Sequence, residues 1–526
     1  MAKLFKKFWP LFVIIALAIV LRVVKLQNLF YFTYDESIPA FVGRRLILWH
    51  HLPLIGGATP FGFHLAPYFY WFLASILFFG KLNPIAWGYA GALLSTITTY
   101  LIYRVGSTFQ NKKLGITAAI FWAFSYLANV YDRHLWALYW GPLLSLVVIL
   151  CLYKLIKGKE NFIFALSAAL VWGITTDPSN LIFVILTIIV FVIYKLPLTK
   201  KTVLAIVIFL LSFSPLVYFD LRHNFANTKP VLNFLKAGKN NPGFTRASFD
   251  QNFLLFPRTF TRLIYKFGDN EISKQYSYCR AYITEKFRAI PEVFVFSSSV
   301  ILIGFTLWSF KRKNRNTWQV VGILVVLYLF GIQLYGTILK ADIFEHYITG
   351  LFAIFLLIFA KIISHLPKKS WVLAIAFFIF FNLQKLAAAQ NGLGLTEKKA
   401  AVNFTLNEVG NEPFSLESLS TCWKYSGYRY LFAAFGREPV KSYVDPNFSY
   451  LYGTTAVWDH HPKTIAAFVI HDFAPETEAF YQKYALYKSH EIKSALFGNL
   501  EVIIMDNTSG WFDEPVINSF RQPIQS

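Results

Sequence analysis

Twelve apolar runs set the main constraint on how this chain of 526 residues can fold. A helix needs about 20 largely apolar residues to cross a lipid bilayer. Charged residues make up only 15% of the sequence, whereas soluble domains contain roughly 25%. The runs and the composition together predict an all-α polytopic membrane protein. The runs cover residues 8–26, 66–79, 85–103, 114–131, 136–153, 161–176, 180–194, 202–219, 292–310, 318–338, 344–363 and 371–388.

The basic residues between these runs indicate which runs cross the membrane, because cytoplasmic loops collect Lys and Arg. Lys3, Lys6 and Lys7 predict a cytoplasmic N-terminus. If all twelve runs crossed, the basic segment 104–113 and every later basic cluster would lie outside. The run 66–79 is short, proline-led and rich in aromatic residues, as an interfacial helix on the outer surface should be. With this run on the surface, all of these basic segments lie on the cytoplasmic side. We therefore expect about 11 transmembrane helices plus one juxtamembrane helix, in the plasma membrane.

This topology puts two long loops and the C-terminal part of the chain on the outer face. The loops cover residues 27–84 and 220–291. The part after the last run alternates apolar stretches with helix-like stretches, which predicts a small α/β domain. We expect a multi-span membrane domain over residues 1–391 and an extracytoplasmic α/β domain over residues 392–526.

The formal charge of +22 does not indicate a nucleic-acid partner, because cytoplasmic loops account for a basic excess in a membrane protein. The segment 220–288 differs, since it holds twelve Lys or Arg and five acids, a net +7, on the predicted outer face. Such a segment suits an anionic lipid headgroup, for example a polyprenyl phosphate.

The three cysteines, Cys151, Cys279 and Cys422, are too few for a disulfide framework.

The adjacent acids Asp35 and Glu36 in the first outer loop are the leading candidates for catalysis. They follow the first apolar run, in a chain with few acidic residues. A carboxylate at the membrane surface can deprotonate an acceptor hydroxyl as a general base, or it can hold a metal ion. A solvated acidic turn, or a cap on a helix that begins near Ser37, is the structural alternative.

Polar residues of complementary kinds lie at the outer ends of other predicted spans. Ionisable residues between apolar spans are costly unless they face a cavity or one another, and Arg presents a planar fork that suits phosphate oxygens. An interfacial anchor is the alternative for the cluster that ends at His134, and a structural histidine is the alternative for His346. The segment 459–461 has too few neighbouring ligands for a metal site. The clusters are Asp132, Arg133 and His134; Arg222 and His223; and His346 and Tyr347 after Glu345.

Three of these features occur together in one known family. They are the Asp35-Glu36 pair, the proline-led aromatic segment 67–71 and a Tyr-x-Arg element that ends at Arg133. On these features the chain resembles the integral-membrane glycosyltransferases of the GT-C superfamily. Within it, the chain is similar to the protein-mannosyltransferase-like group, which includes the bacterial aminoarabinose lipid A transferases. The motifs lie within residues 8–220, and the rest of the membrane part matches by layout only.

The resemblance implies an enzyme that transfers a hexose or pentose from a polyprenyl-phosphate donor, with inversion at the anomeric carbon. Asp35 would be the catalytic base supported by Glu36, and the Arg, His and Tyr clusters would contact the donor. Two departures stand out: Ala66 replaces the first of two prolines, and Ala137 and Leu138 replace an Asp that often follows the outer Arg. The need for a divalent cation is therefore left open, and the acceptor is a lipid, a polysaccharide or a protein.

Two other functions would also account for an outer basic loop. A transporter or flippase should place ionisable residues near mid-bilayer in broken helices, whereas the middles of the predicted spans are nearly free of charge. A polymerase or ligase for a lipid-linked saccharide would share the basic loop. The Asp35-Glu36 pair favours the glycosyltransferase over both.

Overall fold

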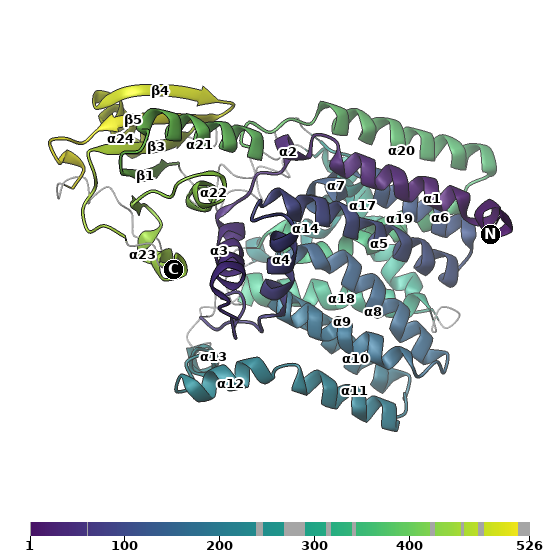
Figure 1. Cartoon of the computed structure of the whole chain (residues 1–526). Helices are drawn as coiled ribbons and strands as arrows, with labels where there is room; N and C mark the ends of the chain where they lie inside the picture. Colours follow the sequence, from purple (N-terminus) through teal and green to yellow (C-terminus); the bar gives the residue numbers. More distant parts are fainter. Residues whose placement is uncertain are drawn as a thin grey trace.

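A helical bundle (residues 2–388) and a region built around a β-sheet (residues 395–513, named the sheet region below) make up the structure (Figure 1). The predicted outer loop 220–291 is described only in part, and Cys279 and Cys422 lie outside the described residues. The computed structural model describes residues 2–59, 62–237, 246–267, 290–311, 317–338, 343–420, 427–453, 457–471 and 478–513.

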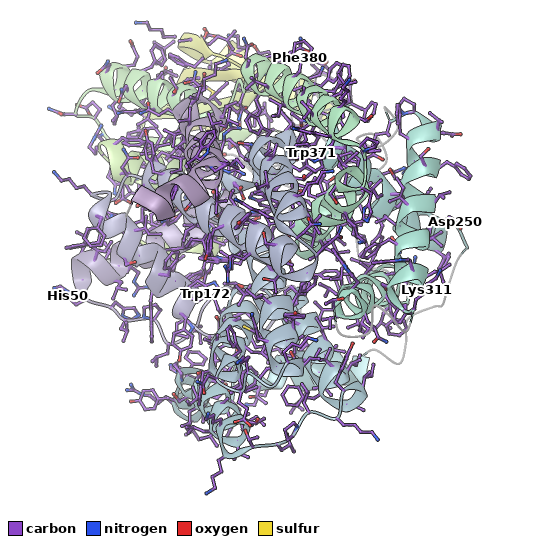
Figure 2. All side chains as sticks on the ribbon, turned by 90° about the vertical axis from the view of Figure 1, so that its right-hand side faces the viewer. His50, Trp172, Asp250, Lys311, Trp371 and Phe380 are labelled. Carbon is purple, nitrogen blue, oxygen red and sulfur yellow. The ribbon has the colours of Figure 1, made fainter. Side chains whose placement is uncertain are left out.

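The bundle consists of apolar helices joined by short turns. Side-chain oxygens at helix starts satisfy amides that the first turn leaves without partners, as Asn111 does for the Leu114 N–H at the start of α6. Apolar side chains such as Phe380 on α20 cover the outside of the bundle (Figure 2), as expected for a surface that faces lipid. The helices are α1 (Ala2–Val23), α2 (Leu26–Leu29), α3 (Tyr34–Trp49), α4 (Tyr68–Phe79), α5 (Ile85–Phe109), α6 (Lys112–Phe124), α7 (Tyr126–Asp132), η1 (Ala137–Trp140), α8 (Gly141–Ile156), α9 (Phe162–Thr176), η2 (Pro178–Asn180), α10 (Leu181–Ile193), α11 (Lys200–Leu211), α12 (Ser214–Arg222), α13 (Thr228–Ala237), α14 (Arg246–Ile264), α17 (Glu292–Ser309), α18 (Trp318–Gln333), η5 (Leu334–Ile338), η6 (Glu345–Leu351), α19 (Phe352–Ser364) and α20 (Lys368–Ala388).

The predicted spans coincide with helices of the bundle. Among the described residues, seven helices are long and apolar enough to cross a membrane, or up to eight if α6 and α7, which meet at 65°, form one span. Shorter apolar helices occupy three further predicted spans, at Trp9–Val23, Phe162–Thr176 and Pro178–Ile193. The fourth short helix is α4, which lies in the run predicted to follow the membrane surface. The helical multi-span fold is confirmed, and the count of eleven spans remains a prediction.

The break between α6 and α7 is stabilised by Arg22, a buried residue near the end of α1. A bend interrupts the hydrogen bonds along a helix and leaves carbonyl groups without their usual partners. The Arg22 guanidinium donates to two such carbonyls, at Trp122 and Ala123, and to Asn129 Oδ1. It also forms a 2.6 Å ion pair with Asp132 at the end of α7. This network holds α1 against the broken helix.

The sheet region contains a mixed five-stranded sheet with helices on both faces. The strand order is β2-β1-β3-β5-β4, with β2, β1 and β3 parallel and β3, β5 and β4 antiparallel. Successive residues of β3 belong to different cores: Ile465 packs with Phe480 of α24, and Ala466 packs with Val402 of α21 and Leu431 of α22. The small α/β fold predicted for this part is present. The elements are α21 (Leu395–Val409), β1 (Phe414–Leu419), α22 (Tyr428–Phe435), β2 (Lys441–Ser442), α23 (Asp445–Phe448), η8 (Ser449–Leu451), β3 (Thr464–Ile470), α24 (Glu478–Ser489), β4 (Glu491–Phe497), β5 (Leu500–Asp506) and η9 (Trp511–Asp513).

Helix α3 contacts both the bundle and the sheet region. It lies across one end of the bundle, next to the sheet region (Figure 1). Arg44 on α3 forms a 2.6 Å ion pair with Glu438, and Phe41 packs edge-on against Tyr430 with the ring centres 5.2 Å apart. Both partners belong to the sheet region. Any residue that α3 presents to the bundle therefore has a position set by both parts.

The orientation in the membrane can be tested by cysteine labelling. In a variant without native cysteines, we expect Lys159→Cys to react only with a membrane-permeant reagent, because its basic turn is predicted to be cytoplasmic. Ala485→Cys on α24 should react with an impermeant reagent. Both positions are exposed. Labelling of Lys159→Cys by the impermeant reagent would contradict the topology.

The contribution of the buried Arg22–Asp132 ion pair to stability can be tested by removing Asp132. Asp132→Ala should lower the free energy of unfolding by about 3–5 kcal/mol, because the buried Arg22 guanidinium loses its charged partner. Thermal unfolding of the detergent-solubilised protein measures this change. Asp459→Ala, at an exposed position, should leave the midpoint unchanged. Equal midpoints for the two variants would show that Arg22 does not depend on Asp132.

Candidate functional site

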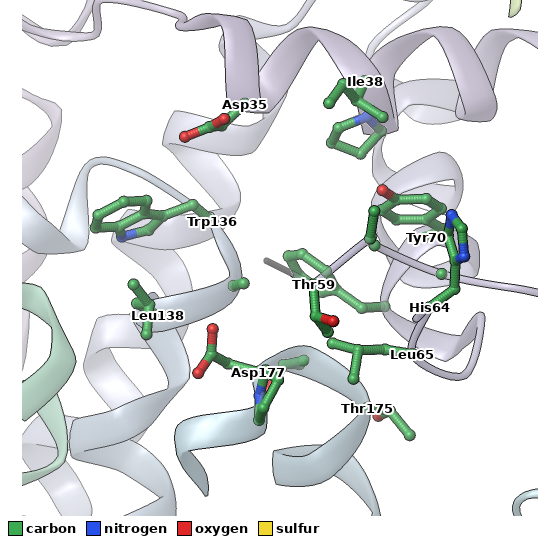
Figure 3. Close-up of a pocket in the computed structure, with 18 of the residues that line it drawn as sticks. Asp35, Ile38, Thr59, His64, Leu65, Tyr70, Trp136, Leu138, Thr175 and Asp177 are labelled. Carbon is green, nitrogen blue, oxygen red and sulfur yellow. The ribbon is translucent and has the colours of Figure 1, made fainter. Parts of the chain in front are cut away.

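A cavity of about 1530 Å³ lies between one end of the bundle, α3 and the sheet region (Figure 3). Its walls come from segments far apart in the sequence: the first loop with α3 and α4, the end of α7, the turn between α9 and α10, the end of α12, α18 and the start of η6. Most of the residues predicted for the site line this cavity. They are Asp35, Glu36, His134, Arg222, His223, His346 and Tyr347.

Asp35 enters the cavity from the first turn of α3. Thr33 is the N-cap of this helix, and Thr33 and Glu36 form a reciprocal capping box. The helix begins at Tyr34, earlier than the start near Ser37 that the capping alternative assumed. The exposed carboxylate of Asp35 projects into the cavity (Figure 3). The acid pair is thus divided between one carboxylate that supports the structure and one that faces the cavity.

Glu36 is 3% exposed and binds two residues. Its Oε2 accepts from the Thr33 N–H at 2.7 Å and from the Thr33 hydroxyl at 3.2 Å, and its Oε1 lies 3.3 Å from His134 Nδ1. Burial raises the pKa of the Glu36 carboxyl, but the hydrogen bonds with His134 and Thr33 outweigh burial and lower that pKa overall. His134 also packs against the rings of Phe30 and Tyr31. The ionised Glu36 therefore links α3 to the turn after α7.

His346 and Tyr347 line the cavity from the segment that follows η5. The imidazole of His346 lies edge-to-face with Trp136, with the ring centres 5.3 Å apart. The preceding residue, Glu345, is fully buried and forms an ion pair with Arg262 of α14. A buried ion pair between two helices restricts both backbones. Glu345 thus anchors the segment while its two neighbours face the cavity.

Arg222 and His223 lie at the exposed end of α12. Asp220, one turn earlier, accepts from the Asn227 N–H at 2.7 Å and from the Thr228 hydroxyl at 2.5 Å, so it closes the turn that follows the helix. This turn directs the helix end towards the cavity. The Arg222 guanidinium there has an exposed position from which it can bind an anionic group.

Asp132 and Arg133 lie outside the cavity, although they were predicted with His134 as one cluster. Asp132 pairs with Arg22, as described above. Arg133 donates from Nη2 to the Leu21 carbonyl at 2.9 Å and from Nε to the Arg22 carbonyl at 3.3 Å. These carbonyls belong to the last turn of α1, where a cation is favoured. The structure therefore separates the cluster into His134, which faces the cavity, and two residues that bind α1.

Asp177 is a cavity residue that the sequence pattern did not single out. It lies in the turn between α9 and α10, where its Oδ1 accepts from the Ser179 N–H at 2.8 Å, and it faces Asp35 from the opposite side of the cavity (Figure 3). Burial raises the pKa of Asp177, and the hydrogen bonds from Ser179 offset part of this effect. An acid between two apolar runs was the available signal, since it is costly unless it faces a cavity.

The sheet region also contributes to the cavity wall, which no sequence pattern indicated. Phe448 and Tyr450 line the cavity next to α3. The ring of Phe448 packs against Tyr34 with the centres 4.6 Å apart, and the Tyr450 carbonyl accepts from Arg45 at 2.8 Å. These contacts pair residues more than 400 positions apart. Only the folded chain brings them together.

An apolar wall of the cavity is formed by α10, α18 and the start of η5. Ile185, Phe330 and Leu334 line the cavity, yet they are 42%, 65% and 41% exposed. Exposed apolar side chains on the apolar helices of a membrane protein suit contact with hydrocarbon chains. The cavity is thus bounded here by side chains that acyl or prenyl chains can reach. Its opposite wall carries the ionisable groups of α3.

The described residues contain no group of three or more His, Cys, Asp or Glu side chains arranged to hold a metal ion. Asp35 and Asp177 are the acids that face the cavity with exposed or partly exposed carboxylates.

No protein-family model and no curated protein matches the chain by sequence. The fold, however, matches solved structures. ArnT from Cupriavidus metallidurans bound to undecaprenyl phosphate superposes with a TM-score of 0.52 at 10% identity, over 94% of this chain and 97% of ArnT. The same protein in the apo state gives 0.44 at 13% identity, over 95% and 98% of the two chains. An Archaeoglobus fulgidus oligosaccharyltransferase in complex with zinc and sulfate gives 0.48 at 8% identity, over 87% and 67%. Only the first score exceeds 0.5, and it shows that the chain shares the fold of ArnT, a fold that the sequence resemblance had predicted.

Proposed function

We propose that this protein is a glycosyltransferase that moves a sugar from a polyprenyl-phosphate donor to an acceptor hydroxyl on the outer face of the membrane. One observation carries the proposal: the exposed carboxylate of Asp35 shares a cavity with the Arg222 guanidinium and with a wall of exposed apolar side chains. Sugar transfer from a lipid phosphate needs a base, an anion-binding group and access for the lipid. ArnT, which has the same fold, binds undecaprenyl phosphate.

The donor would enter along the apolar wall. Ile185, Phe330 and Leu334 would contact the prenyl chain, because they are apolar, exposed and line the cavity. The phosphate would then lie at the membrane edge, within reach of Arg222 and His223 at the end of α12. A guanidinium binds phosphate oxygens in a bidentate manner. This arrangement keeps the sugar in the aqueous part of the cavity.

The chemistry would use Asp35 as the general base. Its carboxylate takes the proton of the acceptor hydroxyl, and the acceptor oxygen attacks the anomeric carbon from the side opposite the phosphate. The bond between that carbon and the phosphate oxygen breaks, and the polyprenyl phosphate leaves with the electron pair, so the configuration inverts. Arg222 and His223 stabilise the charge on the leaving phosphate. Asp177, on the other side of the cavity, would accept hydrogen bonds from hydroxyl groups of the sugar.

Glu36, Asp132 and Arg133 have supporting roles in this proposal. Glu36 positions α3 through Thr33 and His134, and the other two bind α1. His346 and Tyr347 complete the wall beside Trp136. A flippase could use the same apolar wall, but it would move the lipid-linked sugar without consuming it. Donor consumption therefore separates the two functions.

The proposal is tested by incubating the purified protein with a panel of polyprenyl-phosphate sugars and following release of the polyprenyl phosphate. We expect one donor to be consumed when an acceptor-containing membrane extract is present. Asp35→Asn should lower the rate by about 10²–10⁴-fold, because the amide cannot accept the proton. Asp459→Asn, the same change at an exposed position of the sheet region, should retain the rate. Near-normal transfer by Asp35→Asn would exclude Asp35 as the base.

Arg222 offers a separate test of donor binding. Arg222→Gln should raise KM for the donor about tenfold, because one charge-assisted contact to phosphate is lost, and Arg222→Lys should restore part of this loss. KM for the acceptor should not change. The readout is initial rates over a range of donor concentrations. A KM for the donor equal to that of the wild type in Arg222→Gln would place the phosphate elsewhere in the cavity.

A further inference from the structure

We infer that Lys398 of the sheet region is a positioning residue for Asp35, the proposed catalytic base on α3. The inference rests on the proposed function, since it concerns the geometry of Asp35. Lys398 lies on α21 and is 1% exposed. Its Nζ donates to the Tyr31 carbonyl at 2.5 Å and to the Phe32 carbonyl at 2.8 Å. These two carbonyls immediately precede the N-cap of the helix that carries Asp35.

The segment that Lys398 holds has an unusual backbone conformation. Phe32 has φ +31°, which residues with a side chain rarely adopt. Such a conformation persists only where the surroundings enforce it. The ring of Phe32 is fully buried between Trp87 of the bundle and Tyr430 of the sheet region, with ring centres 6.3 and 5.6 Å away. The carbonyl of the same residue binds Lys398. The sheet region thus holds both the ring and the backbone of this residue.

Further contacts hold the same segment from the sheet region. The Leu395 N–H donates to the Phe30 carbonyl at 2.7 Å, one turn before Lys398 on the same helix. Gly427 lies so close that an added Cβ would come within 2.7 Å of the Thr33 carbonyl and 2.9 Å of the Phe32 ring. The direction of α3 at its first turn is therefore determined by residues more than 360 positions later in the chain.

A chain of bonds leads from Lys398 to the cavity. Lys398 binds Tyr31 and Phe32, the next residue, Thr33, caps α3, and Glu36 binds Thr33 and His134. Asp35 lies between Thr33 and Glu36 in the sequence, in the first turn of α3, and its carboxylate faces the cavity. A shift of about 1 Å in a reacting group can cost roughly 100-fold in rate. Loss of the Lys398 contacts should therefore impair the chemical step more than substrate binding.

Lys398→Met is a suitable variant, because it removes the donor to both carbonyls while keeping a long unbranched side chain. Burial lowers the pKa of Lys398 to about 7, although Glu36 and Glu397 favour the charged form. Methionine fills a similar volume but cannot donate to the two carbonyls. Lys399→Met is the matched control, since the neighbouring Lys399 is exposed and faces Phe435 of the sheet region.

Hydrogen exchange and kinetics test the inference together. In Lys398→Met, amides of residues 30–37 should exchange faster than in the wild type, whereas Lys399→Met should match the wild type. The kcat for sugar transfer should fall roughly 10- to 100-fold with the KM for the donor unchanged. In Gly427→Ala the added Cβ would come too close to Thr33 and Phe32. This variant should therefore also lower kcat and leave the KM for the donor unchanged. Gly304→Ala on α17, where an added Cβ meets no atom within 4 Å, should be neutral.

The outcomes separate this inference from the proposed function. If the wild type transfers no sugar from any donor, the proposed function fails, and the exchange of residues 30–37 still tests Lys398. Unchanged exchange in Lys398→Met would overturn the inference. Faster exchange with an unchanged kcat would also overturn it, since Lys398 would then hold the segment without positioning Asp35.

Discussion

The carboxylate of Glu36 joins the start of α3 to the turn after α7, through its bonds with Thr33 and His134. This link holds the first turn of α3 on the bundle, and the cavity depends on it together with the contacts that the sheet region makes to α3 and to the segment before it. A buried carboxylate is stable only with such partners, and removing them would leave its desolvation uncompensated. The bonds that satisfy Glu36 are therefore also the bonds that direct Asp35 into the cavity.

The charged residues of the bundle fall into two groups at the same end of the molecule. Arg22 with Asp132, and Arg262 with Glu345, are buried pairs that tie helices together. Asp35 and Arg222, in contrast, are exposed and line the cavity. Within an apolar environment a charge must be either paired or hydrated. The exposed charges are the ones that a substrate can reach, and this distinction separates structural residues from candidate functional ones.

The sequence predicted the positions of the helices well, because a span must be apolar over its whole length and that property is local. The sequence did not show which residues of each polar cluster bind other helices and which face the cavity. Asp132, Arg133 and His134 are adjacent, yet they point to α1 or to the cavity according to the geometry at the end of α7. Asp177 carried a signal in its apolar surroundings that was not used. Lys398 carried none, since its partners are backbone carbonyls of a distant segment.

The two walls of the cavity give the two substrates of the proposed reaction different routes. The apolar wall of α10 and α18 carries exposed apolar side chains, so it suits the prenyl chain of the donor. Phe448 and Tyr450 of the sheet region, which lies beyond the bundle, line the cavity next to α3 and can contact the acceptor. Asp35 lies on the helix between these two parts. Differences in the acceptor should therefore correspond to changes in the sheet region, whereas the donor is selected by the bundle. If Lys398 positions Asp35 as we infer, its bonds to the segment before α3 couple the acceptor side of the cavity to the proposed catalytic base.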